Sequence, residues 1–167
     1  MVYKIIRRGY SLFITCANYL QSPLLLAIRV YFFWQLFLTG KGKLENIDKV
    51  TQFFTGLGIP YPGLNARFIG LLECFGSLLI IAGLFSRPLA LMIFISMTVA
   101  YVTGDMEALS SIISDPDKFM KADPFVFWLA SLIVFVFGTG LFSLDAFLKF
   151  VLRRRDFAHS DATGRLR

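Results

Sequence analysis

Three charged residues lie within or directly beside long apolar stretches of this chain, where their side chains are suited to chemistry in a membrane. Glu73 lies near the middle of one stretch, and Arg29 interrupts the stretch before it. Arg29, Leu36 and Lys43 repeat every seven residues, so they share one face of a helix. A charge at the centre of a bilayer costs about 2.5–3.5 kcal/mol on insertion scales, and such residues commonly bind ligands, relay protons or pair with one another.

Helix geometry places the three charges at overlapping depths. At 1.5 Å per residue, Arg29 lies roughly 10 Å from one membrane face, and Glu73 lies about 13 Å from the other. In a bilayer about 30 Å thick, Glu73 then falls in depth between Arg29 and Lys43, so it is predicted to pair with one of them. Two interpretations stay open. The pair either fixes helix packing, or it forms a polar pocket that grips an anionic or quinone-like head group or relays a proton.

Other kinds of site are poorly supported by the residue types. Cys16 and Cys74 are far apart and form no CxxC pair, which argues against a thiol–disulfide site. The single histidine, His159, lies in the polar tail. We therefore expect no metal site and no intrinsic cofactor held by protein ligands within the membrane. The glycine-rich stretch 138–145 lacks the Lys-Ser/Thr pair of a phosphate-binding loop.

The composition predicts that helices in a membrane position these residues. Of the 167 residues, 56% are hydrophobic and only 17% are charged, whereas soluble domains carry about 45–50% and about 25%. We expect an all-α membrane protein, an antiparallel four-helix transmembrane bundle with amphipathic interfacial helices. The expected spans are 23–39, 65–85, 88–104 and 124–142. The expected domains are an N-terminal cytoplasmic or interfacial segment (1–22), a four-span domain (23–145) and a basic cytoplasmic tail (146–167).

The sequences that connect the spans predict further helices, caps and turns. Apolar residues recur at helical spacing in 44–57 and 107–120, which predicts helices lying on the membrane surface. Asn65 is expected to cap the second span, and Gly140 is expected to end the fourth. Packing, turn and capping roles are assigned to a further set of residues: Gly40, Gly42, Gly76, Gly83, Arg87, Ser143 and Asp145.

The distribution of charge predicts the orientation. The side holding both termini carries ten Lys and Arg residues, whereas the other carries six together with seven acidic residues. Because basic residues favour the cytoplasmic side, we expect a bacterial inner-membrane protein with both termini in the cytoplasm. The basic clusters flank apolar segments, so the lipid bilayer rather than nucleic acid is the expected partner.

Several motifs resemble the DoxX family. The segment LLLAIRVYFFWQLFLTGKGKL has the arginine and the terminal Gly-x-Gly-Lys of that family's first span, matched here by Arg29, Gly40, Gly42 and Lys43. The segment FFTGLGIPYPGLNARFIGLLECFGSLLIIAGLFSRPLA is similar to the family's LGIP motif, glutamate and GL-[ST]-R turn, and GTGLFSLDAFL is similar to its ending. The resemblance covers about residues 20–150. Phe33 departs from the pattern, because the family commonly has glycine there, and this argues against open space on that helix face.

The resemblance implies a four-helix membrane domain linked to redox chemistry, either quinone-linked sulfur oxidation or oxidative-stress defence. We expect the membrane subunit of such a system, in which Arg29, Lys43 and Glu73 bind a quinone or a small anion. The chain has no electron carrier of its own, so electron transfer would need a bound quinone or a partner oxidoreductase subunit. Whether the chain is itself an enzyme stays open. The alternatives are a non-enzymatic scaffold or assembly partner, and a small ion or metal transporter that uses Glu73.

Overall fold

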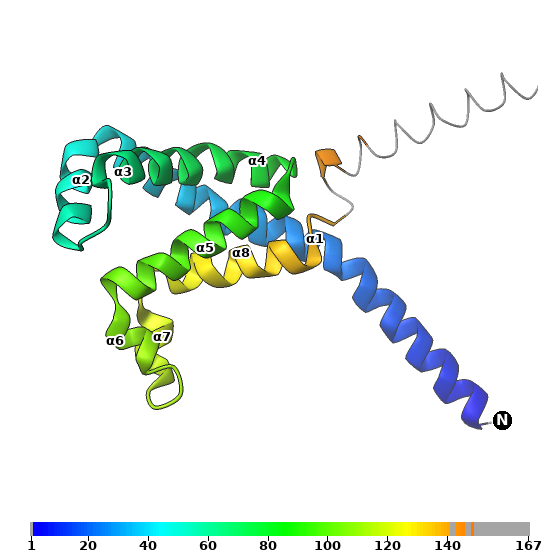
Figure 1. The fold of residues 1–167 in the computed structure, drawn as a ribbon. Helices are drawn as coiled ribbons and strands as arrows, with labels where there is room; N and C mark the ends of the chain where they lie inside the picture. The colour runs from blue at the N-terminus through cyan, green and yellow to red at the C-terminus, as the bar shows by residue number, and fades with distance from the viewer. Residues whose placement is uncertain (1, 141–142, 146–147, 149–167) are drawn as a thin grey trace, which may run out of the picture.

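Helices make up nearly all of the structure, a computed structural model that describes residues 2–140, 143–145 and 148 (Figure 1). The described residues contain no β-strand, so the expectation of an all-α protein is confirmed for this part of the chain. In chain order the elements are α1 (Val2–Glu45), α2 (Ile47–Gly56), α3 (Pro62–Leu71), the π-helix η1 (Leu72–Gly76), α4 (Ser77–Ala82), α5 (Ser86–Gly104), α6 (Met106–Ser110), α7 (Pro116–Lys121) and α8 (Phe125–Phe137).

Three stretches of the described chain are long and apolar enough to cross a membrane. They are Phe13–Glu45 within α1, Pro62–Ala82 formed by α3, η1 and α4 together, and Ser86–Gly104, which is α5. The fourth expected span is shorter. The helix α8 has 13 residues, about 20 Å at the usual rise, against a hydrocarbon layer about 30 Å thick. The described part of the chain therefore has three helices of spanning length and one short apolar helix, and the predicted four-span bundle is not confirmed.

The first helix is longer than the sequence predicted. No boundary separates the expected segment 1–22 from the first span, because α1 continues through Pro23. A proline inside a helix removes one backbone hydrogen bond, and membrane helices tolerate this where neighbouring groups satisfy the freed carbonyl. Figure 1 shows the N-terminal part of α1 extending away from the other helices. Its Phe13 and Tyr19 side chains are exposed.

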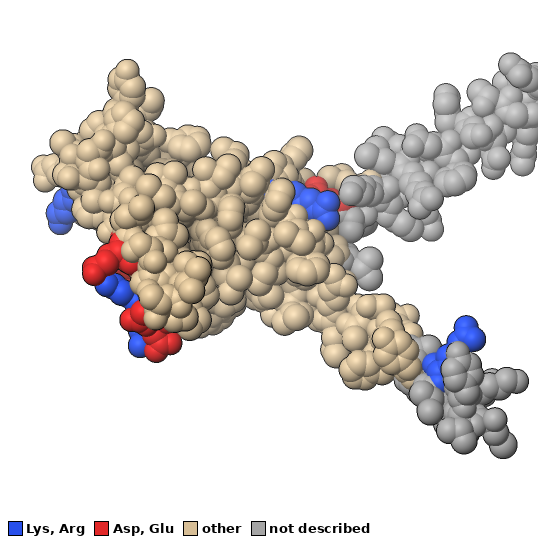
Figure 2. Space-filling model, turned by 60° about the horizontal axis from the view of Figure 1, so that its bottom comes forward, with Lys and Arg blue, Asp and Glu red and all other residues tan. Residues whose placement is uncertain are grey.

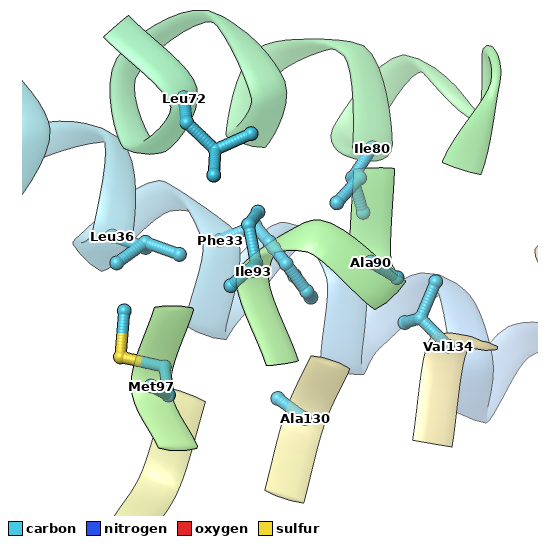
Figure 3. Packing of buried hydrophobic residues seen from close by; sticks show 9 residues of the cluster. All are labelled: Phe33, Leu36, Leu72, Ile80, Ala90, Ile93, Met97, Ala130 and Val134. Carbon is cyan, nitrogen blue, oxygen red and sulfur yellow. The ribbon is translucent and has the colours of Figure 1, made fainter. Parts of the chain in front are cut away.

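The core lies where α1, the α3–α4 helix, α5 and α8 meet (Figure 3). Phe33 of α1 and Ile93 of α5 lie at its centre, and both side chains are buried. Phe33 thus fills the space that a glycine would leave at that position. The remaining buried members of this cluster are Leu36, Leu72, Ile80, Ala90, Met97, Ala130 and Val134.

The end of the molecule that holds α2, α6 and α7 differs in detail from the prediction. A helix is present in the stretch 44–57, as α2, whereas the helix expected at 107–120 is split into α6 and α7, with Pro116 in the first turn of α7. The Tyr101 hydroxyl of α5 donates a hydrogen bond to the Phe119 carbonyl at 2.9 Å and the two rings stack, which anchors α7. Asn65 is not a helix cap: Tyr61 precedes the first turn of α3.

The opposite end is closed by the turn between α4 and α5. Gly83 (φ 77°) and Phe85 (φ 49°) adopt the left-handed conformation, which a glycine adopts without strain. Asp145 holds this turn, because its backbone N–H donates to the Gly83 carbonyl at 3.0 Å and its Oδ1 accepts from the Phe85 N–H at 3.4 Å. The end of α8 is set by Gly138 (φ 75°), not by Gly140 as predicted. The expected basic tail, 146–167, lies outside the described residues apart from residue 148.

Exposed charged side chains lie towards the ends of the molecule on the face shown in Figure 2. On the face shown in Figure 2, most acidic side chains gather near α6 and α7, and a broad surface without charges separates them from basic side chains towards the other end. Many large apolar side chains are exposed on α3, η1 and α5, among them Phe68, Phe75, Ile95 and Val99. A soluble protein rarely exposes so much contiguous apolar surface, whereas a bilayer covers it.

Candidate functional site

Glu73 and Lys43 form an ion pair inside the bundle. The Lys43 Nζ atom lies 2.6 Å from Glu73 Oε1, a charge-assisted hydrogen bond. Glu73 is 1% exposed, whereas the Lys43 side chain is 28% exposed. The second carboxylate oxygen of Glu73, Oε2, is buried and has no hydrogen-bond partner among the described residues. A buried carboxylate oxygen without a donor is unfavourable, so this site is suited to a ligand that supplies one.

A close helix crossing positions the pair. A Cβ atom added at Gly40 of α1 would lie 2.5 Å from the backbone nitrogen of Cys74 and 2.7 Å from Glu73 Cβ. Only glycine therefore allows the two backbones to approach this closely. Lys43 lies one helical turn after Gly40, and its side chain therefore lies beside Glu73.

The carboxylate belongs to a π-helical turn. Residues Leu72–Gly76 form η1, which interrupts an otherwise α-helical span from Pro62 to Ala82. Such π-bulges are rare and occur frequently at functional sites. The sequence reasoning treated this span as a regular α-helix.

The pair lines a cavity of about 830 Å³ between α1, α2, α3, η1, α5 and the start of α8. This volume is within the usual range for small-molecule sites. The lining is mostly apolar, with Leu36, Phe54 and Phe127 among its residues. Glu73 is the most deeply buried of the polar lining residues, which are Thr39, Lys43, Lys49, Asn65, Glu73, Ser96, Thr103, Asp105 and Asp123.

Arg29 does not share this site, which corrects the prediction of one polar centre containing all three charges. Its side chain is fully buried and does not line the cavity. A Cβ atom at Gly83 would lie 2.6 Å from Arg29 Nη1, so the guanidinium packs against the α4–α5 turn. The physical reason is side-chain direction: helical side chains lean towards the N-terminus of their own helix. Lys43 and Glu73, on antiparallel helices, lean towards each other, whereas Arg29 leans away from both.

The glycines assigned to packing have different surroundings. A Cβ at Gly83 would lie 2.5 Å from Ser143 Cβ, so this position is as crowded as Gly40. A Cβ at Gly76 would lie 3.4 Å from Leu72 Cδ1 and 3.8 Å from Ile93 Cδ1, so Gly76 faces the core rather than the cavity. A Cβ at Gly42 would meet nothing within 4 Å. Among the described residues, therefore, no close contact requires glycine at position 42.

Three polar residues were assigned to turns and caps. Arg87 Nη2 donates to the Val136 carbonyl at 3.4 Å, which links the start of α5 to the end of α8. Ser143 Oγ donates to the Gly140 carbonyl at 3.3 Å. Asp145 binds the α4–α5 turn as described above. These contacts lie at the end of the molecule opposite to the Lys43–Glu73 pair.

The sequence reasoning missed most of the cavity. Thr39 precedes Lys43 by one helical turn, and Ser96 and Thr103 are seven residues apart on one face of α5. Those two spacings were the available signals for a polar stripe facing the site. In the described part of the chain, no three His, Cys, Asp or Glu side chains come close enough together to hold a metal ion.

Comparison with known proteins identifies the domain. The DoxX family model matches residues 24–106, a range that includes Lys43, Glu73 and the helix crossing at Gly40. No curated protein and no solved structure matches the chain. Together with the three apolar helices of spanning length, the match shows that this chain is a membrane protein of the DoxX family.

Proposed function

We propose that this protein is the membrane subunit of a quinone-linked redox system and that its cavity binds the quinone head group. The observation that carries the proposal is the placement of a buried ion pair in an otherwise apolar cavity of about 830 Å³. Ligand sites typically combine such a lining with a few polar groups that orient the ligand.

The two charged groups match the chemistry of a quinone head group. The partly exposed Lys43 ammonium can donate a hydrogen bond to a ring carbonyl, because an ammonium has three donors and Glu73 Oε1 takes one of them. Glu73 Oε2 can accept a hydrogen bond from the hydroxyl of the reduced ring. The apolar lining, which includes Leu36, Phe54 and Phe127, suits the faces of the quinone ring and the start of its hydrocarbon tail.

The proposal also includes a partner oxidoreductase subunit as the electron donor, since a bound quinone accepts electrons only from a donor. The connection that contains α6 and α7 offers a polar surface for such a partner. Glu107, Asp115 and Asp117 are exposed there, and Lys118 Nζ lies 2.8 Å from Glu107 Oε1 and lowers the pKa of that carboxyl. We further propose a bacterial inner-membrane location with this connection outside and both termini in the cytoplasm, as the charge distribution favours.

Binding of a short-chain quinone to the purified protein in lipid nanodiscs tests the proposal. Glu73→Gln and Lys43→Met are each expected to raise the dissociation constant about tenfold or more, as loss of a hydrogen bond to a charged group predicts. Lys41→Met is the matched control, because Lys41 pairs with Glu45 on the exposed surface of the same helix. Wild-type protein that binds no quinone, or variants that bind it as well as wild type does, would contradict the proposal.

A further inference from the structure

Two of the helices that form the cavity, α3 and α5, diverge from one another. Close to the turn at Gly83, α5 contacts α4 and η1, whereas α3 has no comparable contact with α5. The helix formed by α3, η1 and α4 is therefore close to α5 at the turn, and the two separate towards α2 (Figure 1). The cavity occupies this opening, because residues of both α3 and α5 line it.

The edges of this opening are apolar and exposed. Phe68 of α3 is 48% exposed and Ile95 of α5 is 52% exposed, and both line the cavity. Met92 and Val99, on either side of Ile95 along α5, are also exposed lining residues. We call Phe68, Met92, Ile95 and Val99 the lateral rim. Because α3 and α5 belong to helices of spanning length, exposed apolar side chains at mid-helix face the hydrocarbon of the bilayer.

A second, polar edge lies at the outer end of the same cavity. Lys49 of α2, Asp105 after α5 and Asp123 before α8 line it there. The cavity thus has an apolar edge towards lipid and a charged edge near the membrane surface. A ligand that dissolves in the bilayer would meet the first, and a ligand that dissolves in water would meet the second.

We infer that the lateral rim is an entrance through which an uncharged, single-tailed amphiphile passes from the bilayer, so that its head group reaches Lys43 and Glu73 while its tail stays between α3 and α5. The inference rests on the proposed function only in that the cavity holds a ligand. Lys43 and Glu73 together carry no net charge, so a neutral head group with hydroxyl or carbonyl oxygens fits the pair better than a phosphate does. The buried Oε2 of Glu73, which has no hydrogen-bond partner among the residues that the structure describes, adds the requirement for a donor.

Collision of a spin label with relaxing agents tests the entrance without any ligand. A nitroxide at position 96, where the half-buried Ser96 lines the cavity, is to be compared in nanodiscs with labels at two reference positions. Val102 is exposed on α5 outside the cavity, and Lys49 lies at the polar edge. The label at 96 is expected to be relaxed by oxygen, which concentrates in lipid, as strongly as the label at 102. Relaxation by a water-soluble nickel chelate, at the level of the label at 49, would overturn the inference.

Association kinetics give a second and separate test. Ile95→Trp narrows the lateral rim, and Val102→Trp adds the same side chain to α5 at a similarly exposed position outside the cavity. For a decyl-substituted benzoquinone in nanodiscs, Ile95→Trp is expected to lower the association rate constant about fivefold, while Val102→Trp leaves it unchanged. Equal rates in the two variants would overturn the inference. If the wild-type protein binds no decyl quinone, the proposed function fails, and the spin-label pattern still decides where the cavity opens.

Discussion

At the scale of single residues, the structure separates two cations, Arg29 and Lys43, that the sequence left as alternative partners of Glu73. Lys43 pairs with Glu73 in the cavity, whereas Arg29 packs against Gly83 at the other end of the bundle. Helical repeats place Arg29 and Lys43 on one face correctly. They do not show which way each side chain leans, and this direction decides the pairing.

Substitution of Arg29 should therefore affect stability without affecting the cavity. Arg29→Met is expected to lower the melting temperature, because it removes a guanidinium that fills the space beside the α4–α5 turn. The dissociation constant for a short-chain quinone should remain within about twofold of the wild-type value, a difference of less than ~0.5 kcal/mol. Thermal unfolding in detergent and quinone titration measure the two effects. A rise in the dissociation constant as large as that of Lys43→Met would place Arg29 in the site after all.

The second carboxylate oxygen of Glu73, which accepts no hydrogen bond within the described part of the chain, predicts a preference between the two redox forms of the ligand. Oε2 accepts hydrogen bonds, and a quinone offers only carbonyl acceptors, whereas a hydroquinone offers hydroxyl donors. The reduced form is expected to bind about tenfold more tightly, in line with one additional hydrogen bond to a charged group. Titrations under anaerobic conditions with the two forms of one decyl-substituted ring measure the ratio. Glu73→Gln should reduce it, and tighter binding of the oxidised form would contradict the prediction.

At the scale of elements, local patterns predicted the helices that are regular and bounded by glycine or proline. The helices α2 and α5 lie close to their expected positions. The expected start of the first span at residue 23 is not a helix boundary in the structure, because α1 continues through Pro23, and a proline is compatible with a continuous membrane helix. The π-turn at Glu73 and the divergence of α3 from α5 depend on contacts between helices. For this reason the sequence offered only two helical spacings as signals for the cavity, Thr39 with Lys43 and Ser96 with Thr103.

The crossing of α1 and η1 can be tested with two neighbouring glycines. Gly40→Ala is expected to destabilise the protein by about 1–3 kcal/mol, the usual effect of overpacking, because its Cβ would lie 2.5 Å from the Cys74 nitrogen. Gly42→Ala is the matched control in the same helix, and its Cβ meets nothing within 4 Å. It should be neutral or stabilise by up to about 1 kcal/mol through helix propensity. Unfolding midpoints measured in one detergent provide the comparison, and equal effects of the two substitutions would refute the tight crossing.

At the scale of the whole molecule, the short helix α8 determines where the described residues that follow it lie. Although α8 alone is shorter than a bilayer is thick, Gly140 and Asp145 reach the end of the bundle that holds the α4–α5 turn. A Cβ at Gly140 would lie 3.2 Å from the Ser22 Cα atom, and Asp145 binds the Gly83 carbonyl. Thus α8 and the segment that follows it together return the chain to the side from which α1 enters the bundle.

This arrangement predicts that both ends of the chain lie on one side of the membrane and the α6–α7 connection on the other. Fluorescent-protein fusions at residue 1 and at residue 167 should both fluoresce in bacterial cells, because this reporter folds in the cytoplasm. A cysteine at position 113, where Ile113 is 91% exposed, should react with an impermeant maleimide added outside. Cys16, which the structure also exposes, serves as the internal control and should react only after the membrane is permeabilised. Fluorescence from one terminus alone would mean that α8 does not complete a crossing, and the interpretation of the Asp145 contacts as a transmembrane return would then be wrong.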